Sequence, residues 1–409
     1  MSIRNFVKGK DYPEWMKEEA LVTLSKGYLY KEETPRDMYA RVATAAAEDL
    51  GMPEMKEKFL DYMWKGWLCP ASPVLSNTGL ERGLPISCFG LSVPDSIVGI
   101  YDSAKELGVM TKNGGGVGIC LSNVRERGAL IRGGENGASE GVVPWAKIYD
   151  SAIIGTAQGG VRRGAASVNL DVEHPDIHEF LRIRRPHGDI NRQCLNLHHC
   201  VQIGDDWMRS MIQGDTEKRK IWIEILKTRM ETGEPYIMYK DHVNNANPEA
   251  YKKNGLNVEM TNICSEITLF TDALHSFICC LSSLNLAKWE EWKDTDLPEV
   301  ATYFLNGILN GFIKKASKME GMERSVRSAI KGRAIGIGVL GFHTLLQSEM
   351  TPIDSLRATL LNKYIFKTIN EKATKASQEL AKKFGEPEWC KGTGMYNSHL
   401  IALAPTRSN

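Results

Sequence analysis

The sequence lacks a long apolar run and an excess of charge of either sign. No stretch approaches the roughly 20 apolar residues that a membrane-spanning helix needs. The polar start of the chain, residues 1–12, carries no apolar signal-peptide core. The 51 basic and 50 acidic residues leave a formal net charge of +1. We therefore expect a cytoplasmic protein without a membrane or nucleic-acid partner, which would hold any nucleotide in a local pocket.

A disulfide framework is also not expected. The nine cysteines are odd in number and no export signal precedes them, which favours reduced thiols inside the cell. Taken singly, most such cysteines are small buried apolar residues.

The chain shows no internal repeat or low-complexity tract, and its first part reads as helical. Thr34-Pro35-Arg36-Asp37 supplies an N-cap, a proline in the first turn and an acid, and Gly51 ends the apolar pattern. A second helix is predicted over 55–63 and a third over 13–28. A packing role is the simplest interpretation of this region.

From about Trp67 onward, short apolar segments alternate with glycine-rich loops and amphipathic helices, which is typical of an α/β fold. The predicted strands are 117–121, 165–170 and 197–203. The predicted helices are near 96–110, 144–157, 175–184, 219–232 and 290–317.

Two glycine-rich loops carry arginines. They span 125–134 and 158–164, and neither matches a phosphate loop or a GxGxxG fingerprint. Glycine lets a ligand approach the backbone and arginine offers forked donors. Each loop is either part of a nucleotide site or an ordinary solvated turn.

The most informative segment is Asn262-x-Cys264-x-Glu266. Alternate residues of an extended segment face the same side, so an amide, a thiol and a carboxylate would converge there. Such a set suits hydrogen abstraction beside a base. A buried cysteine among polar loop residues is the alternative. Two more cysteines, Cys88 and Cys279, lie in distant strand-like apolar segments.

Together these residues resemble the catalytic (alpha) subunit of ribonucleotide reductases, through nearly all of 67–409. Asn262, Cys264 and Glu266 match the finger-loop motif of that family, and Cys88 with Cys279 match its reducing pair. The segments 76–79, 174–177 and 232–237 also resemble segments of that family. Asn-Ile-Cys-Ser-Glu-Ile is most similar to class I enzymes.

The resemblance implies a fold. It is the ten-stranded α/β barrel of ribonucleotide reductases and glycyl-radical enzymes, with two five-stranded halves and the finger loop through its centre. We expect a small helical N-terminal domain over 1–66 and the barrel over 67–409.

It also implies roles for residues. Cys264 would become a thiyl radical and take the 3′ hydrogen of the ribose, while Glu266 accepts the 3′-hydroxyl proton. Cys88 would protonate the departing 2′-hydroxyl and end in a disulfide with Cys279. Asn262 would orient the substrate, expected to be a ribonucleoside diphosphate.

Three binding regions follow from the same resemblance. The substrate would be bound by Ser72, Ser87, Pro405, Thr406, Arg407 and Ser408. A deoxynucleotide or ATP effector would be bound by Asp95, Ser96, Ile97, Arg125 and Arg132, although Asp95 is also readable as a plain helix cap. Gln158 and Arg162 would relay effector identity to the substrate base.

The chain departs from the family pattern at both ends. We expect no ATP cone before the barrel and hence no shut-off by dATP. The barrel is expected to be incomplete beyond Asn409, with the remainder on a complementing chain, as in a phage or split-gene form. The other expected partners are a metal-containing radical-generating subunit, thioredoxin or glutaredoxin, and a second copy bound through the effector site.

The sequence leaves three alternatives open, which concern the radical source, the catalytic role and metal binding. The radical source could be adenosylcobalamin, as in class II reductases. The chain could also be a non-catalytic nucleotide-binding regulatory fragment. Finally, Cys194, His198, His199 and Cys200 could be considered a metal site, but their spacing is not a recognised zinc pattern, and we predict no metal and no cofactor bound directly by this chain.

Overall fold

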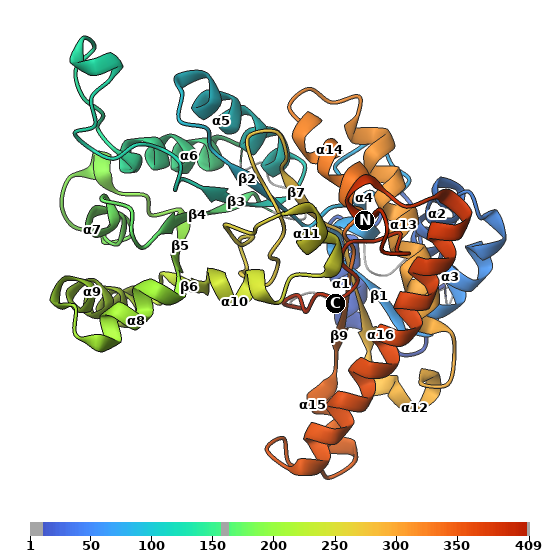
Figure 1. Cartoon of the computed structure of the whole chain (residues 1–409). Helices are drawn as coiled ribbons and strands as arrows, with labels where there is room; N and C mark the ends of the chain where they lie inside the picture. Colours follow the sequence, from blue (N-terminus) through green and yellow to red (C-terminus); the bar gives the residue numbers. More distant parts are fainter. Residues whose placement is uncertain (1–10, 157–162, 407–409) are drawn as a thin grey trace. The chain divides into compact units, whose positions relative to one another are not determined.

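Residues 11–156 and 163–406 are described by a computed structural model, in which the chain divides into two units built from distant segments (Figure 1). The first unit comprises Met1–Ser87, Cys279–Lys318 and Ala329–Asn409. The second comprises Cys88–Ile278 and Met319–Ser328. None of the helices within the described ranges is long and apolar enough to cross a membrane.

The first unit begins with the helices that the sequence predicts. They are α1 (Glu18–Ser25), α2 (Pro35–Leu50) and α3 (Lys56–Trp64). Thr34 and Asp37 form a complete capping box at the start of α2, and Gly51 ends it in the left-handed conformation with φ of 73°. The predicted 13–28 helix is shorter than expected, since only Glu18–Ser25 is helical.

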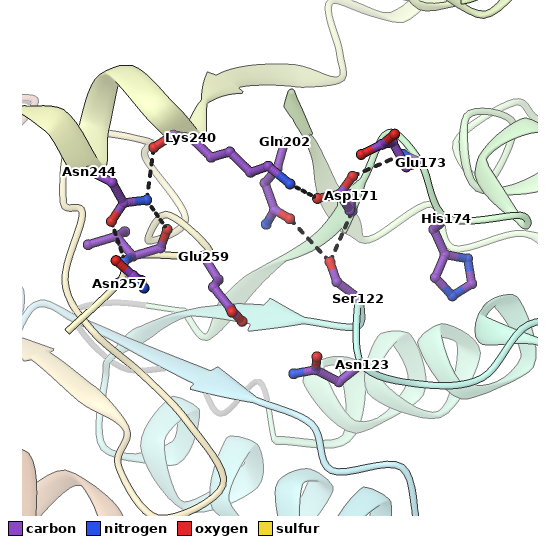
Figure 2. Close-up of a pocket in the computed structure, with 11 residues that line it drawn as sticks. Ser122, Asn123, Asp171, Glu173, His174, Gln202, Lys240, Asn244, Asn257 and Glu259 are labelled. Atoms are coloured by element: carbon purple, nitrogen blue, oxygen red, sulfur yellow. Dashed lines mark hydrogen bonds and ion pairs between the residues drawn. The ribbon is translucent and has the colours of Figure 1, made fainter. Parts of the chain in front are cut away.

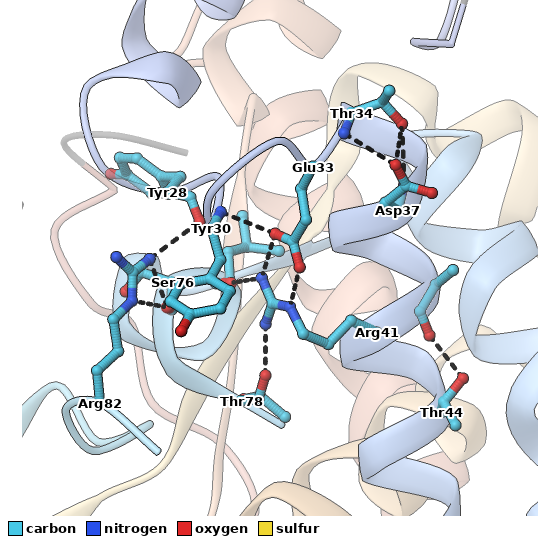
Figure 3. Close-up of polar contacts among 12 residues, drawn as sticks. Tyr28, Tyr30, Glu33, Thr34, Asp37, Arg41, Thr44, Ser76, Thr78 and Arg82 are labelled. Carbon is cyan, nitrogen blue, oxygen red and sulfur yellow. Dashed lines mark hydrogen bonds and ion pairs between the residues drawn. The ribbon is translucent and has the colours of Figure 1, made fainter. Parts of the chain in front are cut away.

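Arg41 of α2 ties two loops of the first unit together (Figure 3). Its Nε donates to Glu33 Oε1 at 2.7 Å, and its Nη2 donates to Glu33 Oε2 at 3.0 Å. The same guanidinium donates to the carbonyls of Leu75 and Thr78. One half-buried cation therefore fixes the segment before α2 against the end of α4 (Ser72–Asn77).

A three-stranded sheet completes the first unit, in the order β1-β8-β9. Its strands are β1 (Leu68–Pro70), β8 (Leu281–Asn285) and β9 (Gly336–Leu340). The helices around it include α12 (Trp289–Trp292), α13 (Leu297–Ala316), α14 (Glu323–Gly332), which continues from the second unit, α15 (Phe342–Ser348) and α16 (Leu356–Phe384). The core lies where α13 packs on α2, α3 and α16, with Phe304 and Phe59 edge to face at 5.4 Å.

The prediction of one continuous helix near 290–317 is wrong, because the structure has two helices there. α12 ends at Trp292, and α13 begins at Leu297 with Pro298 in its first turn. Proline fits the first turn of a helix but interrupts a helix interior, so the chain breaks between the two.

The second unit is built on a six-stranded sheet in the order β6-β5-β4-β3-β2-β7, in which the pairings from β2 to β6 are parallel. The strands are β2 (Cys88–Ser92), β3 (Gly116–Cys120), β4 (Ala165–Asp171), β5 (Leu197–Ile203), β6 (Tyr236–Tyr239) and β7 (Phe277–Cys279), whose last residue is counted with the first unit. Every residue of β2 and β3 is buried. Parallel strands that are buried on both faces appear in a sequence as continuous apolar runs. The strands predicted over 117–121, 165–170 and 197–203 are confirmed as β3, β4 and β5.

Helices connect these parallel strands, as a parallel sheet requires. They are α5 (Ile97–Lys112), α6 (Val142–Thr156), α7 (Ile177–Phe180), α8 (Asp205–Gln213) and α9 (Thr216–Thr232). Two more helices, α10 (Lys240–Asn245) and α11 (Glu249–Asn254), follow β6. The predicted α/β class and the helices near 96–110, 144–157 and 219–232 are confirmed. The one predicted over 175–184 is only the single turn of α7.

Candidate active site

The loop 261–267 lies directly on strand β3 of the second unit. A methyl group added at Gly118 would lie 2.3 Å from the carbonyl oxygen of Thr261. One added at Gly116 would lie 2.7 Å from Cγ2 of Ile263. The loop can therefore contact β3 this closely only because residues 116 and 118 are glycines, which have no side chain.

Asn262 closes this loop into a turn. Its Oδ1 accepts hydrogen bonds from the backbone N–H groups of Glu266 at 3.1 Å and Ile267 at 3.0 Å. Ser265 takes a left-handed φ of 66°. The side chain of Asn262 is fully buried, and its Nδ2 has no hydrogen-bond partner among the described residues. The amide therefore retains a donor that can bind a ligand.

The turn brings Cys264 and Glu266 beside Cys88, the first residue of β2. The Sγ atoms of Cys88 and Cys264 and a carboxylate oxygen of Glu266 all lie within 4.8 Å of one another. Cys88 is buried, whereas Cys264 is exposed. Two thiols and a carboxylate at this separation can exchange protons and hydrogen atoms around a small substrate. The same groups are also metal ligands by type, so geometry alone leaves two chemistries.

The predicted residues Cys279, Ser87 and Ser72 belong to the first unit. The carbonyl of Cys279 accepts a hydrogen bond from the N–H of Ser87 at 3.3 Å, and both side chains are buried. The hydroxyl of Ser72 lies 2.8 Å from that of Tyr28. Because Cys88 and Cys279 are assigned to different units, their pairing stays a prediction.

The predicted tail residues are described only in part. Pro405 is exposed and Thr406 is half-buried. Four predicted residues lie outside the described residues: Gln158, Arg162, Arg407 and Ser408.

The predicted effector residues meet at the amino end of α5. Arg125 donates from its backbone N–H and from Nε to the carboxylate of Asp95, with the shortest contact at 2.9 Å. The Ser96 hydroxyl accepts from the N–H of Gly99 at 3.0 Å and caps the helix. Ile97 is 61% exposed. Arg132, in contrast, is an exposed residue of a separate short turn, with φ of 50°.

A polar cavity of about 460 Å³ lies at the carboxyl ends of β3 to β6 (Figure 2). Its lining is Ser122, Asn123, Asp171, Glu173, His174, Gln202, Lys240, Asn244, Asn257, Val258 and Glu259. Lys240 Nζ pairs with Asp171, and the Ser122 hydroxyl donates to Gln202 Oε1 at 3.1 Å. Burial, more than neighbouring acids, raises the pKa of Glu259. Sequence reasoning missed this cavity, although Ser122 and Asp171 directly follow predicted strands.

The histidines between Cys194 and Cys200 have a carboxylate as their partner. His198 Nδ1 and His199 Nδ1 both contact Glu234, the latter at 3.1 Å. Although burial opposes it, hydrogen bonds from the two imidazoles hold the pKa of Glu234 well below its ordinary range. Burial raises the pKa of the thiols of Cys194 and Cys200 to about 12. Among the described residues, the ligand atoms of Cys194, His198, His199 and Cys200 do not come together as a group that could hold a metal ion.

The comparisons with known proteins agree with this geometry. The family model of the ribonucleotide reductase barrel domain matches residues 86–218 and 212–393. The model of the ribonucleotide reductase all-alpha domain matches residues 16–83. The chain therefore belongs to the ribonucleotide reductase large-subunit family, and the fold class inferred from the finger-loop motif is confirmed.

Individual relatives support the assignment. A protein of Frog virus 3, provisionally named ribonucleoside-diphosphate reductase large subunit, is 39% identical over 376 residues, which are 88% of this chain and 65% of that protein. The large subunit of Invertebrate iridescent virus 3 is 33% identical, over 95% of this chain and 71% of its own. The class Id alpha subunit of Actinobacillus ureae superposes with a TM-score of 0.90 at 41% identity, over 97% of this chain and 73% of its own.

The chain spans only part of these relatives. The matched segment is 65% of the Frog virus 3 protein, 73% of the Actinobacillus ureae subunit and only 53% of the large subunit of Arabidopsis thaliana, which is 30% identical. The activity, substrates and partners of the complete relatives are therefore proposals for this chain.

Proposed function

We propose that this chain carries the catalytic centre of a class I ribonucleotide reductase that converts ribonucleoside diphosphates into 2′-deoxyribonucleotides. The observation that carries the proposal is the placement of Cys88, Cys264 and Glu266 within 4.8 Å of one another. The relatives named above are reductases, which favours thiol chemistry over metal binding at these three groups.

The chemistry follows from the positions of the groups. A thiyl radical on Cys264 takes the 3′ hydrogen of the ribose and leaves a 3′ carbon radical. Glu266 accepts the 3′-hydroxyl proton, and Cys88 gives a proton to the 2′-hydroxyl, which leaves as water. Cys279 then gives a hydrogen atom to the 2′ carbon and forms an S–S bond with the Cys88 thiolate, and the electron that this releases, with the proton returned by Glu266, restores the 3′ carbon radical. Return of the hydrogen to the 3′ carbon regenerates the radical on Cys264.

The substrate would be oriented by groups around this centre. The buried Nδ2 of Asn262 has no partner among the described residues, and it is suited to donate to a ribose hydroxyl. The other proposed substrate-binding residues are Ser72, Ser87, Pro405, Thr406, Arg407 and Ser408. Their hydroxyls and backbone amides suit phosphate oxygens.

A deoxynucleotide or ATP effector would bind at the amino end of α5, to Asp95, Ser96, Ile97, Arg125 and Arg132. Large apolar side chains are exposed at the same place: Ile97 by 61%, Val98 by 70% and Tyr101 by 55%. Apolar residues gathered on one surface are typical of a protein interface. This supports the proposal of a homodimer formed through the effector site, with Gln158 and Arg162 as relay residues.

The remaining partners are proposed from the family alone. They are a metal-containing radical-generating subunit, a thioredoxin or glutaredoxin that reduces the disulfide, and the part of the enzyme that the relatives have beyond the matched segment, on this or a complementing chain. We also propose the division into a helical domain over 1–66 and a barrel domain over 67–409, and a cytoplasmic location.

The test is reductase activity in the complete complex, with either a metal-containing subunit or adenosylcobalamin as radical source. Reduction of a ribonucleoside diphosphate is expected with the subunit alone, and C264S should abolish it while nucleotide binding stays. Turnover by C264S would overturn the proposal. Nucleotide binding without turnover under either source would favour a regulatory protein instead.

A further inference from the structure

The segment that leads into Cys264 is held by side-chain amides. Residues 256–262 form no helix or strand, so their backbone groups lack the partners that regular structure provides. Backbone groups in such a segment still need hydrogen bonds, because leaving them unpaired is costly. The partners they find therefore decide where the loop lies.

Asn244 of α10 supplies the most extensive of these contacts (Figure 2). Its Oδ1 accepts from the N–H of Val258 at 2.7 Å, and its Nδ2 donates to the carbonyl of Val258 at 2.9 Å. One side-chain amide thus binds both polar groups of one residue, as a neighbouring strand would. Val258 itself is buried, and Asn244 is half-buried where it lines the polar cavity.

The amide of Asn244 is itself fixed in orientation. Its Nδ2 also donates to the carbonyl of Lys240 at 2.9 Å. Asn247, which is 7% exposed, donates from Nδ2 to Asn244 Oδ1 at 3.0 Å and to the carbonyl of Leu256 at 3.3 Å. The amide cannot be turned over without losing bonds at both ends.

Further along, the segment is held from the sheet side. Asn169 of β4 is fully buried, and its Oδ1 lies 3.4 Å from both the backbone nitrogen and the hydroxyl oxygen of Thr261. Gly118 lies against the carbonyl of the same residue. With Val258 bound by Asn244 and Thr261 bound by Asn169, only two residues separate Thr261 from Cys264.

We propose that Asn244 is a positioning residue, which places Cys264 beside Cys88 and Glu266 by binding the backbone of Val258. The placement concerns this chain's own geometry and can be measured without turnover. Its importance for catalysis rests on the proposed function.

The experiment traps the two thiols as a disulfide. In a C279S background, which removes a competing partner, diamide takes two electrons and two protons from Cys88 and Cys264 and leaves an S–S bond between them. The Sγ atoms start within 4.8 Å of each other, so closure needs only a small loop movement. The rate is followed by peptide mapping. We expect N244A to slow closure at least tenfold and N244D, which keeps the acceptor but not the donor, to give an intermediate rate.

The matched control is N254A. The amide of Asn254 donates to the carbonyl of Ala250 within α11, so its loss should leave the rate within twofold of the parent. Circular dichroism and the unfolding midpoint identify any variant that fails to fold, and N247A then replaces N244A. An unchanged closure rate in a folded N244A or N247A protein would overturn the proposal.

Turnover in the complete enzyme, with Cys279 restored, separates this proposal from the proposed function. We expect N244A to lower kcat at least tenfold with little change in KM, because substrate contacts remain. Slow disulfide closure in an enzyme that never reduces nucleotides would leave the positioning role intact and defeat only the reductase assignment.

Discussion

Arg125 and Asp95 form an ion pair of 2.9 Å across 30 residues of sequence, between the glycine-rich loop 125–134 and the amino end of α5. Both side chains are about one-third exposed. Exposed pairs of this kind contribute roughly 0–1 kcal/mol to stability. The pair therefore contributes little to stability, and the proposed role of Asp95 in effector binding can be tested without unfolding the protein.

Replacing Asp95 by Asn should weaken effector binding at least tenfold and leave the unfolding midpoint nearly unchanged, because a carboxylate accepts hydrogen bonds from sugar hydroxyls more strongly than an amide does. Equilibrium binding of dATP and dTTP measures the effect. The control is D102N, an exposed acid elsewhere on α5. Equal affinities in the two variants would remove Asp95 from the effector site.

Iodoacetamide should modify Cys264 before the other thiols in the folded protein at pH 8. Cys264 is exposed, whereas Cys194, Cys200 and Cys280 are buried and burial raises their thiol pKa to about 12. Only a thiolate reacts at a useful rate. Mass spectrometry of tryptic peptides gives the order of labelling, and C264S should lose the fast phase. A fast phase that persists in C264S would contradict the exposure of this loop.

Gly118→Ala should destabilise the protein and lower activity together. The new methyl group would lie 2.3 Å from the carbonyl oxygen of Thr261, and overpacking of this kind costs about 1–3 kcal/mol. Urea unfolding measures the loss. Gly155→Ala in α6 is the control, since no other group lies within 4 Å there, and it should be neutral or slightly stabilising.

Acid should destabilise the protein partly through His399. Burial lowers the pKa of this imidazole to about 4, below the value of about 6.5 of an unfolded chain. Below pH 6.5 the unfolded state binds the proton first, so the contribution to stability is complete above that pH and is lost as pH falls towards 4. We expect a loss of about 1–2 kcal/mol between pH 7 and pH 5.

The measurement is the free energy of unfolding of wild type and H399Q at both pH values. The variant should lose less stability on acidification. H343Q, at an exposed position of α15, should behave like wild type. Parallel pH profiles for wild type and H399Q would contradict the assignment.

The sequence predicts much of this fold because the signals are local. The cap at Thr34 and the stop at Gly51 fix α2, and buried parallel strands such as β3 give continuous apolar runs. The convergence of Cys264 and Glu266 was also predictable from alternation. Alternation along an extended segment is, however, not the physical cause. The segment is a tight turn with Ser265 in the left-handed conformation, and the Asn262 side chain accepts a hydrogen bond from the N–H of Glu266.

What escapes prediction depends on residues far apart in the chain. Asn244 lies 14 residues before Val258, and Asn169 lies 92 residues before Thr261. No periodicity marks either partner. The only hint is the concentration of asparagines over 244–247, a residue whose side chain can replace a backbone partner.

The direction of the parallel strands has one more consequence. Cys88 and Gly116 begin β2 and β3, whereas Ser122 and Asp171 lie where β3 and β4 finish. A strand of five residues is about 13 Å long. The length of these strands thus separates the thiol of Cys88 from the carboxylates and the lysine that line the cavity at the opposite edge of the sheet, so that an ion bound in that cavity would not contact the proposed radical site.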